Sequence, residues 1–247
     1  MLTYERTAEE IQAAEADIAI VPIGSLEQHS RHLPVNTDNI IAEAYAKALG
    51  RRLPTYVLPV LPISTCREHM GRKGSVWMRP ETCYQMIQDI CLSLKEQGFR
   101  KVVILKTHGG IFILPPAVRQ LNALYNPDLL VCLVDYEVSS GAMKAAGVSQ
   151  SPELHAGEGE TSLLLHLRPD LVHMDRAVDC LPDVPREYLN YASIFRFSPH
   201  GVWGTPSRAT AETGARMVEL FAAAAEAYVR EVFALMENKG TFGYSAF

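Results

Sequence analysis

Carboxylates and imidazoles crowd the segment SLEQHSRHLPVNTD, residues 25–38, which directly follows the apolar run DIAIVPIG. Glu27 and His29 are two positions apart, so on an extended backbone their side chains point the same way. A carboxylate and a neutral imidazole are ligands for zinc, manganese or iron. The spacing therefore predicts metal binding directly after a buried strand.

Two positions of this segment admit a second interpretation. Asp38, or Thr37 before it, could be only the N-cap of the helix that follows, because both residue types favour that position. His32 could orient a metal ligand, contact the substrate, or be a hydrogen-bonded structural histidine. The segment by itself leaves these roles open.

The apolar run KVVILK, residues 101–106, leads into a second candidate loop, Thr107-His108-Gly109-Gly110. Paired glycines let the backbone turn sharply and come close to a ligand, which suits His108 to metal binding. The alternative is a tight strand-to-helix turn with an incidental histidine. A phosphate-binding loop is a weaker interpretation, because neither GxGxxG nor a Walker A sequence is present.

A third loop, HAGEGETS at residues 155–162, places His155 and Glu160 among small residues. Glu158 and Glu160 also suit the first turn of a helix, where the helix dipole favours a carboxylate whatever its function. That alternative does not explain why three loops each supply a histidine together with carboxylates or glycines. The combination predicts one shared site for metal ions.

The elements between these loops alternate between strand-like and helical patterns. Such alternation indicates βαβ units and a mainly parallel sheet with helices on both faces, and sites in such sheets form outside the carboxyl ends of the strands. We expect a single α/β domain over residues 1–247. Strands are predicted at 18–23, 56–61, 101–106 and 129–134, helices at 7–14, 38–49, 80–97, 115–125, 137–146, 160–167 and 209–236, and a polar loop at 63–75.

Composition argues against several classes of partner. The chain is 48% hydrophobic, and its formal net charge of −5 gives no reason to expect nucleic acid or an anionic membrane surface. No apolar run is long enough to span a bilayer, and the polar N-terminus lacks the features of a signal peptide. The five cysteines are scattered without a CxxC pair, which favours reduced thiols and a cytoplasmic location.

Taken together, these motifs resemble the creatininase family. EQHSRHLPVNTD is similar to a signature in which Glu-x-His is followed by His-Leu-Pro and then Thr-Asp. THGG resembles the second motif of that family, HAGEGETS the third, and GVWGTPSRATAETG the C-terminal stretch. The resemblance extends over roughly residues 21–214, with all four motifs in order.

The resemblance implies a three-layer α/β/α sandwich and a metal-dependent hydrolase, usually with two divalent ions and often assembled as a hexamer. His155 matches a residue implicated as proton donor in the family, and we expect His155 and Glu160 to be catalytic. Asp38 is expected to bridge the two ions. The implied ligands are Glu27, Asp38 and His108 for one ion, and His29, Asp38 and Glu160 for the other.

Several positions depart from the family pattern. In creatininase itself a carboxylate lies two residues after the histidine of the second motif; here that position is Gly110, and Glu160 is the expected replacement. Ile111 stands where the second motif usually ends in Asn. Ser30-Arg31 stands where relatives often have Gly-Pro.

The loop after the third predicted strand also differs. Relatives usually have His followed by Phe-Pro-Gly-Thr, whereas this chain has HMGRKGS at 69–75, which puts two cations in place of an apolar pair. This change bears on the substrate more than on the metal site. We predict that substrate is bound by His69, Arg72, Lys73, Gly109 and Gly110.

The predicted reaction is the opening of a small cyclic substrate by hydroxide that two Zn, Mn or Fe ions generate from water, with attack on a carbonyl. Our first expectation is a cyclic amide, cleaved at its C–N bond. The alternatives are a cyclic polyol ketone of the inosose type, cleaved at a C–C bond, and a deformylase- or peptidase-type amide. His155 would protonate the leaving group.

Two non-hydrolytic alternatives are less well supported. An α/β binding protein with a structural metal would favour cysteine ligands in a closed shell. A nucleotide-binding module would need a glycine-rich first turn, which GSLEQHS does not supply. The alanine-rich helix near the C-terminus suits packing on the sheet or a subunit contact, and we expect a homo-oligomer that acts on a small molecule.

Overall fold

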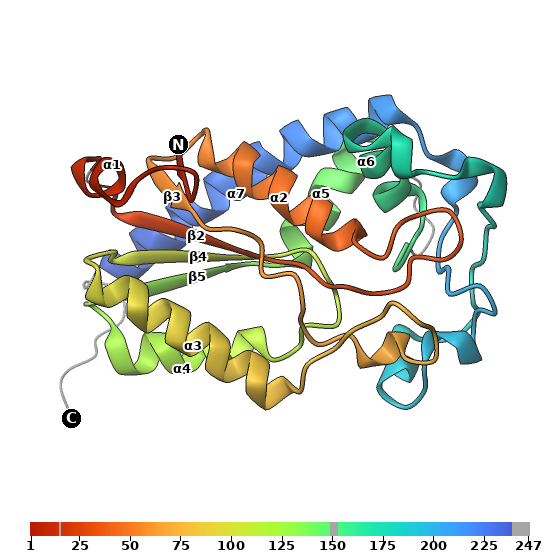
Figure 1. The fold of residues 1–247 in the computed structure, drawn as a ribbon, viewed down its shortest axis with the longest axis horizontal. Coiled ribbons are helices and arrows are strands. Elements are labelled where there is room, and N and C mark those ends of the chain that lie inside the picture. The colour runs from red at the N-terminus through yellow and green to blue at the C-terminus, as the bar shows by residue number, and fades with distance from the viewer. Residues whose placement is uncertain (15, 149–152, 239–247) are drawn as a thin grey trace.

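The computed structural model describes residues 1–14, 16–148 and 153–238. Its centre is a sheet of parallel strands in the order β1-β3-β2-β4-β5 (Figure 1). Ile18 pairs with both Thr55 and Lys101, which puts β2 in the middle of the sheet. The strands are β1 (Leu2–Thr3), β2 (Ile18–Ile23), β3 (Thr55–Val57), β4 (Lys101–Lys106) and β5 (Leu130–Val134).

Helices cover both faces of this sheet and complete three layers. In Figure 1, α2, α5, α6 and α7 lie above the strands, and α3 and α4 lie below them. The expected three-layer α/β/α sandwich with a mainly parallel sheet is confirmed. The helices are α1 (Ala8–Ala13), α2 (Thr37–Gly50), α3 (Pro80–Glu96), α4 (Leu114–Tyr125), α5 (Tyr136–Ala145), α6 (Glu158–Leu167) and α7 (Ala211–Glu237).

Strands buried on both faces explain the continuous apolar runs of β2 and β4. Successive side chains of a strand point to opposite faces. Val103 and Leu105 therefore join the core between the sheet and helices α2 and α7, whereas Val102 and Ile104 join the core between the sheet and helices α3 and α4. Tyr45 of α2 stacks on Phe221 of α7 at a ring-centroid distance of 3.8 Å. Neither face of the sheet is left to solvent, as is usual for parallel sheets.

The predicted elements agree with the structure to within a few residues at their ends. The two strands that precede the first two candidate loops have the predicted bounds, Ile18–Ile23 and Lys101–Lys106. The predicted strand at 56–61 is shorter, because regular pairing ends at Val57 and only Leu61 makes an isolated bridge, to Ile23. The short edge strand β1 was not predicted, and the polar loop at 63–75 contains a turn of 3₁₀ helix, η1 (Arg67–His69).

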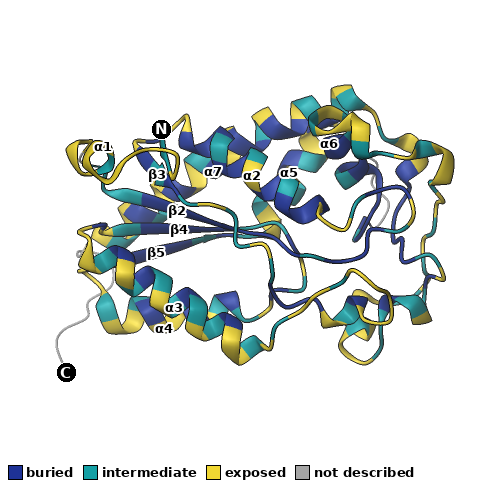
Figure 2. Cartoon of the chain, viewed as in Figure 1, coloured by how far each residue is buried: buried dark blue, intermediate teal, exposed yellow. Residues whose placement is uncertain are grey.

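Burial extends past the carboxyl ends of the strands into the loops. In Figure 2 the buried colouring of β2 continues into the segment that follows it, and this segment includes the fully buried polar residues Ser25, Glu27 and His29. Buried polar side chains have to find partners.

None of the helices within the described ranges combines the length and the hydrophobicity that a membrane span needs.

Candidate metal centre

The loops after β2 and β4 meet because these two strands are neighbours and run parallel. Thr107, the first residue after β4, donates its backbone N–H to the carbonyl of Ile23, the last residue of β2, at 3.2 Å. Its hydroxyl donates to the backbone carbonyl of Asp38 at 2.9 Å. These bonds hold the first turn of α2 beside the loop that contains His108.

Glu27 lies fully buried at the centre of a ring of histidines. Its Oε2 is 3.1 Å from Nδ1 of His108, and its Oε1 is 3.2 Å from Nε2 of His69 and 3.5 Å from Nδ1 of His155. Burial would raise the pKa of Glu27, but the neighbouring imidazoles, His108 first among them, lower it well below its usual range. Glu27 is therefore a carboxylate at neutral pH.

A second group joins His29, Asp38 and Glu160. Nε2 of His29 is 3.8 Å from Oδ1 of Asp38 and 3.6 Å from Oε2 of Glu160. Burial would lower the pKa of His29, yet the two carboxylates raise it to about 9. Burial and the nearby Glu27 raise the pKa of Asp38 well above its usual range. The carboxylates and the imidazole of this group therefore shift one another's pKa strongly.

The orientation of His29 leaves one nitrogen free for a ligand. Its Nδ1 is 3.2 Å from the backbone carbonyl of Glu27, and a carbonyl only accepts hydrogen bonds, so Nδ1 carries the proton. Nε2 is then the basic nitrogen, and it faces Asp38 and Glu160. A carbonyl on one ring nitrogen is the usual way in which a metal-binding histidine is oriented.

Gln28 fixes two further histidines. The backbone N–H of Ser30 donates to Oε1 of Gln28 at 2.9 Å, so Nε2 is the amide end that faces Nδ1 of His69 at 2.9 Å. His69 therefore accepts at Nδ1 and directs its protonated Nε2 at Glu27. With that tautomer, His69 suits the positioning of Glu27 better than direct metal binding.

His155 is held in the opposite tautomer, with a free Nδ1. Its Nε2 donates to the backbone carbonyl of Gln28 at 2.7 Å, which leaves Nδ1 unprotonated on the side of Glu27. Burial, together with the charge of the nearby His29, lowers the pKa of His155 to about 4. The imidazole is therefore neutral at physiological pH, and Nδ1 is its unprotonated nitrogen.

The backbone is strained at the two positions that follow His29 and His155. Ser30 has φ 61° and Ala156 has φ 50°, both in the left-handed region that non-glycine residues seldom adopt. Such conformations cost about 1–3 kcal/mol and cluster at functional sites. At Ala156 the strained turn points the backbone N–H at Oε2 of Glu160, 2.6 Å away, and so helps to orient that carboxylate.

The donor set fits divalent cations. Several buried atoms of the cluster have no hydrogen-bond partner among the described residues, including Oε1 of Glu27, Nε2 of His29, Oδ2 of Asp38 and Nε2 of His108. Orphaned buried polar atoms are costly unless something else pairs with them. Three groups offer ligand atoms within 4.8 Å of one another: Glu27, His69 and His108; Glu27, His29 and His155; and His29, Asp38 and Glu160.

A cavity of about 140 Å³ opens beside this cluster. His69, His108, His155 and Glu160 line it together with Gly109 and Gly110, and further walls come from Tyr45, Tyr136, Arg186 and Met217. The arrangement can therefore bring a small molecule to the ligand cluster.

Most of the site residues that the sequence predicts come together here, but two do not. Glu27, His29, Asp38, His108, His155 and Glu160 all lie in the cluster, and His69, Gly109 and Gly110 line the cavity. Arg72 instead stacks on the ring of Phe195 at 4.5 Å. Neither Arg72 nor Lys73 lines this cavity, so their predicted contact with substrate has no support from their position.

The structure also decides between alternatives that the sequence leaves open. The N-cap of α2 is Asn36, without a side-chain capping bond, and Asp38 is buried inside the first turn, so Asp38 is not a cap. His32 bonds through Nε2 to the hydroxyl of Thr161 at 3.0 Å and so contacts the residue after Glu160. Ile111 is fully buried in the core with α3 and α4.

Three side chains of the site are not among those that the sequence predicts. Gln28 lies between two ligand candidates, and its residue type by itself indicates no role. Glu68 directly precedes His69 in a polar loop. A carboxylate next to a histidine is a pattern that could have indicated a role at a metal site. Glu153 is buried and accepts from the N–H and hydroxyl of Thr205 at 2.9 and 3.0 Å; no local pattern marks it.

Comparison with known proteins agrees with this geometry. The model of the creatininase family, described as creatinine amidohydrolase, matches residues 4–229. The creatinine amidohydrolase of Pseudomonas putida is 27% identical over 94% of this chain and 95% of its own length. A mycofactocin precursor peptide peptidase of Mycobacterium ulcerans is 30% identical over 80% of this chain and 78% of its own length. The 3-dehydro-scyllo-inosose hydrolase of Thermotoga maritima is 26% identical over 77% of this chain, and the match covers only 63% of that protein.

Solved structures give the same assignment. A creatininase mutant complexed with creatine superimposes with a TM-score of 0.80 at 25% identity, over 94% of this chain and 98% of the other. A manganese form of creatininase has a TM-score of 0.76 at 25% identity, over 93% and 98%. The chain therefore belongs to the creatininase family of hydrolases.

Proposed function

We propose that this protein is a hydrolase with two divalent metal ions that opens a small cyclic amide. The observation that supports it most directly is the convergence of buried carboxylates and imidazoles at the wall of a small cavity, where several of their polar atoms lack a hydrogen-bond partner among the described residues. Structural zinc sites are typically closed and rich in cysteine, whereas this cluster is built from oxygen and nitrogen donors and adjoins open space.

The ligands divide between two ions, with Asp38 shared. One ion is assigned to Glu27, Asp38 and His108, where Nδ1 of His108 lies 3.1 Å from Glu27 and 3.8 Å from Asp38. The other is assigned to His29, Asp38 and Glu160. Burial, followed by the charge of Glu27, raises the pKa of Asp38. Burial would lower the pKa of His29 and His108, but the neighbouring carboxylates raise it, and a group of carboxylates with this effect suits the binding of cations.

Divalent cations supply Lewis acidity and lower the pKa of water to near neutrality. The contribution of the chain is to place a proton acceptor beside them. His155 presents an unprotonated Nδ1 toward the cluster, so this atom would take up the proton of the attacking water and pass it to the leaving nitrogen. Gln28 holds the imidazole in the tautomer that this transfer requires.

The size of the cavity favours a small ring. An engineered protein cavity of about 150 Å³ accommodates benzene, and the cavity here is of similar volume, about 140 Å³. A five- or six-membered cyclic amide is of that size. A cyclic polyol ketone has a similar ring, and the similarity to the inosose hydrolase keeps it among the substrates to be tested.

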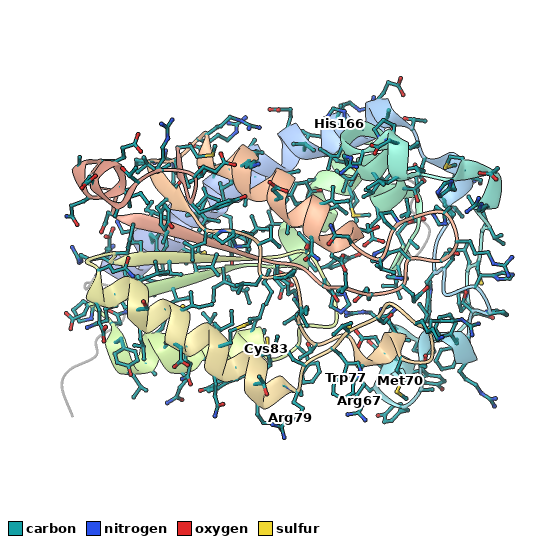
Figure 3. The ribbon with its side chains drawn as sticks, in the orientation of Figure 1. Arg67, Met70, Trp77, Arg79, Cys83 and His166 are labelled. Carbon is teal, nitrogen blue, oxygen red and sulfur yellow. The ribbon has the colours of Figure 1, made fainter. Side chains whose placement is uncertain are left out.

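A peptide-like amide is a second candidate, because a larger groove adjoins the cavity. Its volume is about 1260 Å³, and it shares Glu68, Gly109 and Arg186 with the cavity. Arg67, Met70, Trp77 and Arg79 belong to the lining of this groove, and Figure 3 shows these four side chains near the start of α3. An extended chain could lie in the groove with one amide at the metal cluster, which agrees with the similarity to the peptidase.

The test is metal content followed by activity. Purified protein is stripped with a chelator, reloaded with zinc, manganese or iron, and assayed against cyclic amides, cyclic polyol ketones, formamides and short peptides. We expect about two ions per chain and turnover of one class, with loss of both in Glu27→Gln. The control is Glu81→Gln, which removes an exposed carboxylate of α3. A protein that binds no metal and turns over no substrate would contradict the proposal.

The protein is also proposed to form a homo-oligomer, as the family resemblance implies. Exposed aromatic side chains such as Phe112 and Tyr191 are consistent with a covered surface in an assembly. Light scattering that gives only the monomer mass would refute this part of the proposal.

A further inference from the structure

Glu68 faces the second nitrogen of His108 from a different loop. It lies in η1, between β3 and α3, and its Oε1 is 3.4 Å from Nε2 of His108. The other nitrogen of the same ring, Nδ1, is directed at Glu27 and Asp38. His108 is therefore placed between the carboxylates assigned to one ion on one side and Glu68 on the other.

The absence of a side chain at Gly110 makes room for this carboxylate. A Cβ built on Gly110 would overlap Oε1 of Glu68, and the carboxyl carbon of Glu68 would be only 2.7 Å away. The hydroxyl of Thr65 donates to the carbonyl of Gly110 at 2.8 Å and so ties the loop of Glu68 to the loop of His108. Glu160, which the sequence predicts as the replacement for a carboxylate at position 110, lies beside His29 and so is not the carboxylate that faces Nε2 of His108.

The contact between Glu68 and His108 pairs a carboxylate with the second nitrogen of a proposed metal-binding histidine. A histidine that binds a metal through one nitrogen commonly donates its other N–H to a carboxylate, which orients the ring and increases its basicity. Nε2 of His108 is buried and has no hydrogen-bond partner among the described residues. The side chain of Glu68 is 17% exposed toward the cavity, so a small rotation of it would close the bond.

We infer that Glu68 is a positioning residue for His108 and sets the affinity of the ion held by Glu27, Asp38 and His108. The inference rests on the proposed two-ion centre. Glu68 acts through the imidazole, and so the ion held by His29, Asp38 and Glu160 does not depend on it. To orient His108 in this way, a carboxylate has to occupy the space in front of Gly110.

The experiment measures the affinity of each ion separately by chelator competition, together with the visible spectrum of the cobalt-loaded protein. Glu68→Gln keeps the shape of the side chain and removes its charge, and Glu68→Ala removes both. Glu81→Gln is the matched control, since it removes an exposed carboxylate elsewhere. Formate is then added to Glu68→Ala, because the cavity that Glu68 lines gives a small carboxylate access to the vacated space.

We expect both Glu68 variants to bind one ion about 10–100-fold more weakly, the range usual for loss of such a supporting partner. The second ion and the control variant should be unchanged. Formate should restore affinity and the cobalt spectrum in Glu68→Ala but not alter the parent protein.

Three outcomes would overturn the inference. Parent-like affinity for both ions in Glu68→Gln and Glu68→Ala would refute it while leaving the two-ion centre intact. Equal weakening of both ions, without rescue by formate, would show that Glu68 supports only the fold of its loop. A parent protein that binds no ion would refute the proposed function and this inference with it.

Discussion

Nε2 of His29 lies 3.6 Å from Oε2 of Glu160, although one residue follows β2 and the other belongs to α6. The backbone N–H of Ala156 holds the same carboxylate oxygen at 2.6 Å. Glu160 is thus directed at His29 by a strained turn. The relationship makes the carboxylate of Glu160 specific to one of the two proposed ions.

Glu160→Ala should therefore lose one ion and keep the other. The ion assigned to His29 and Asp38 would have too few protein ligands, whereas Glu27 and His108 are untouched. Metal content after gel filtration measures this, with Glu219→Ala as control because Glu219 is an exposed carboxylate of α7. Retention of both ions by Glu160→Ala would remove it from the ligand set.

His155→Gln should lower kcat about 100- to 10,000-fold, the usual contribution of a positioned proton-transfer group, and leave metal content unchanged. The reason is that the free Nδ1 of His155 is the proposed proton acceptor. The matched control is His166→Gln, since His166 is exposed on α6 and lies far from the strand ends in Figure 3. Equal activity of the two variants would exclude His155 from catalysis.

His32 should make the stability of metal-free protein sensitive to acid. Burial, followed by the charge of His29, lowers the pKa of His32 to about 4, against about 6.5 in an unfolded chain. Between these values the unfolded state binds more protons, so the free energy of unfolding falls as the pH decreases from 6.5 to 4.

The measurement is urea denaturation of chelator-treated protein at several pH values in that window. His32→Asn removes the titrating group, so its free energy of unfolding should depend less steeply on pH than that of the parent. The matched control is His166→Asn, which removes an exposed histidine of α6. Identical slopes for the parent and His32→Asn would count against the neutral, buried state of His32.

Two glycine-to-alanine changes should have opposite signs. A Cβ on Gly214 of α7 would collide with the backbone carbonyl of Ser162 in α6, and overpacking of this kind costs about 1–3 kcal/mol. A Cβ on Gly141 of α5 meets nothing within 4 Å, so Gly141→Ala should gain about 0.5–1 kcal/mol of helix stability. Thermal unfolding of both variants checks this, and a stabilised Gly214→Ala would contradict the close approach of α6 to α7.

One thiol should react rapidly in the native protein. Burial raises the pKa of Cys83 to about 11 and of Cys91 and Cys132 to about 12, and the pKa of Cys66 is also raised to about 11. Cys180 is only half-buried. An aromatic disulfide reagent at about pH 8 should therefore modify Cys180 first, and Cys180→Ser should abolish the fast phase. Several fast thiols would show that the core opens readily.

The sequence alone determined the elements that hold the site. Continuous apolar runs predict β2 and β4 with their observed bounds, because burial on both faces of a parallel strand requires such runs. The rule that sites form at the carboxyl ends of strands then directs attention to Glu27, His108 and their neighbours. Each of these signals lies within a short segment, so it can be recognised without knowing which segments pack together.

Only the tertiary structure decided which loops complete the site. Glu68 reaches His108 because Thr65 bonds to Gly110. Gln28 orients His69 through its side-chain amide and His155 through its backbone carbonyl, and the same amide also donates to the carbonyl of Gly201 at 3.2 Å. These contacts join residues far apart in the sequence, and no periodicity encodes them. Arg72 is a further example. Its position in the sequence predicts contact with the substrate, but in the structure its guanidinium packs on the ring of Phe195. The residue types of a loop indicate which chemistry its side chains can do. Long-range hydrogen bonds and packing decide which other loop it contacts, and therefore at which site those side chains act.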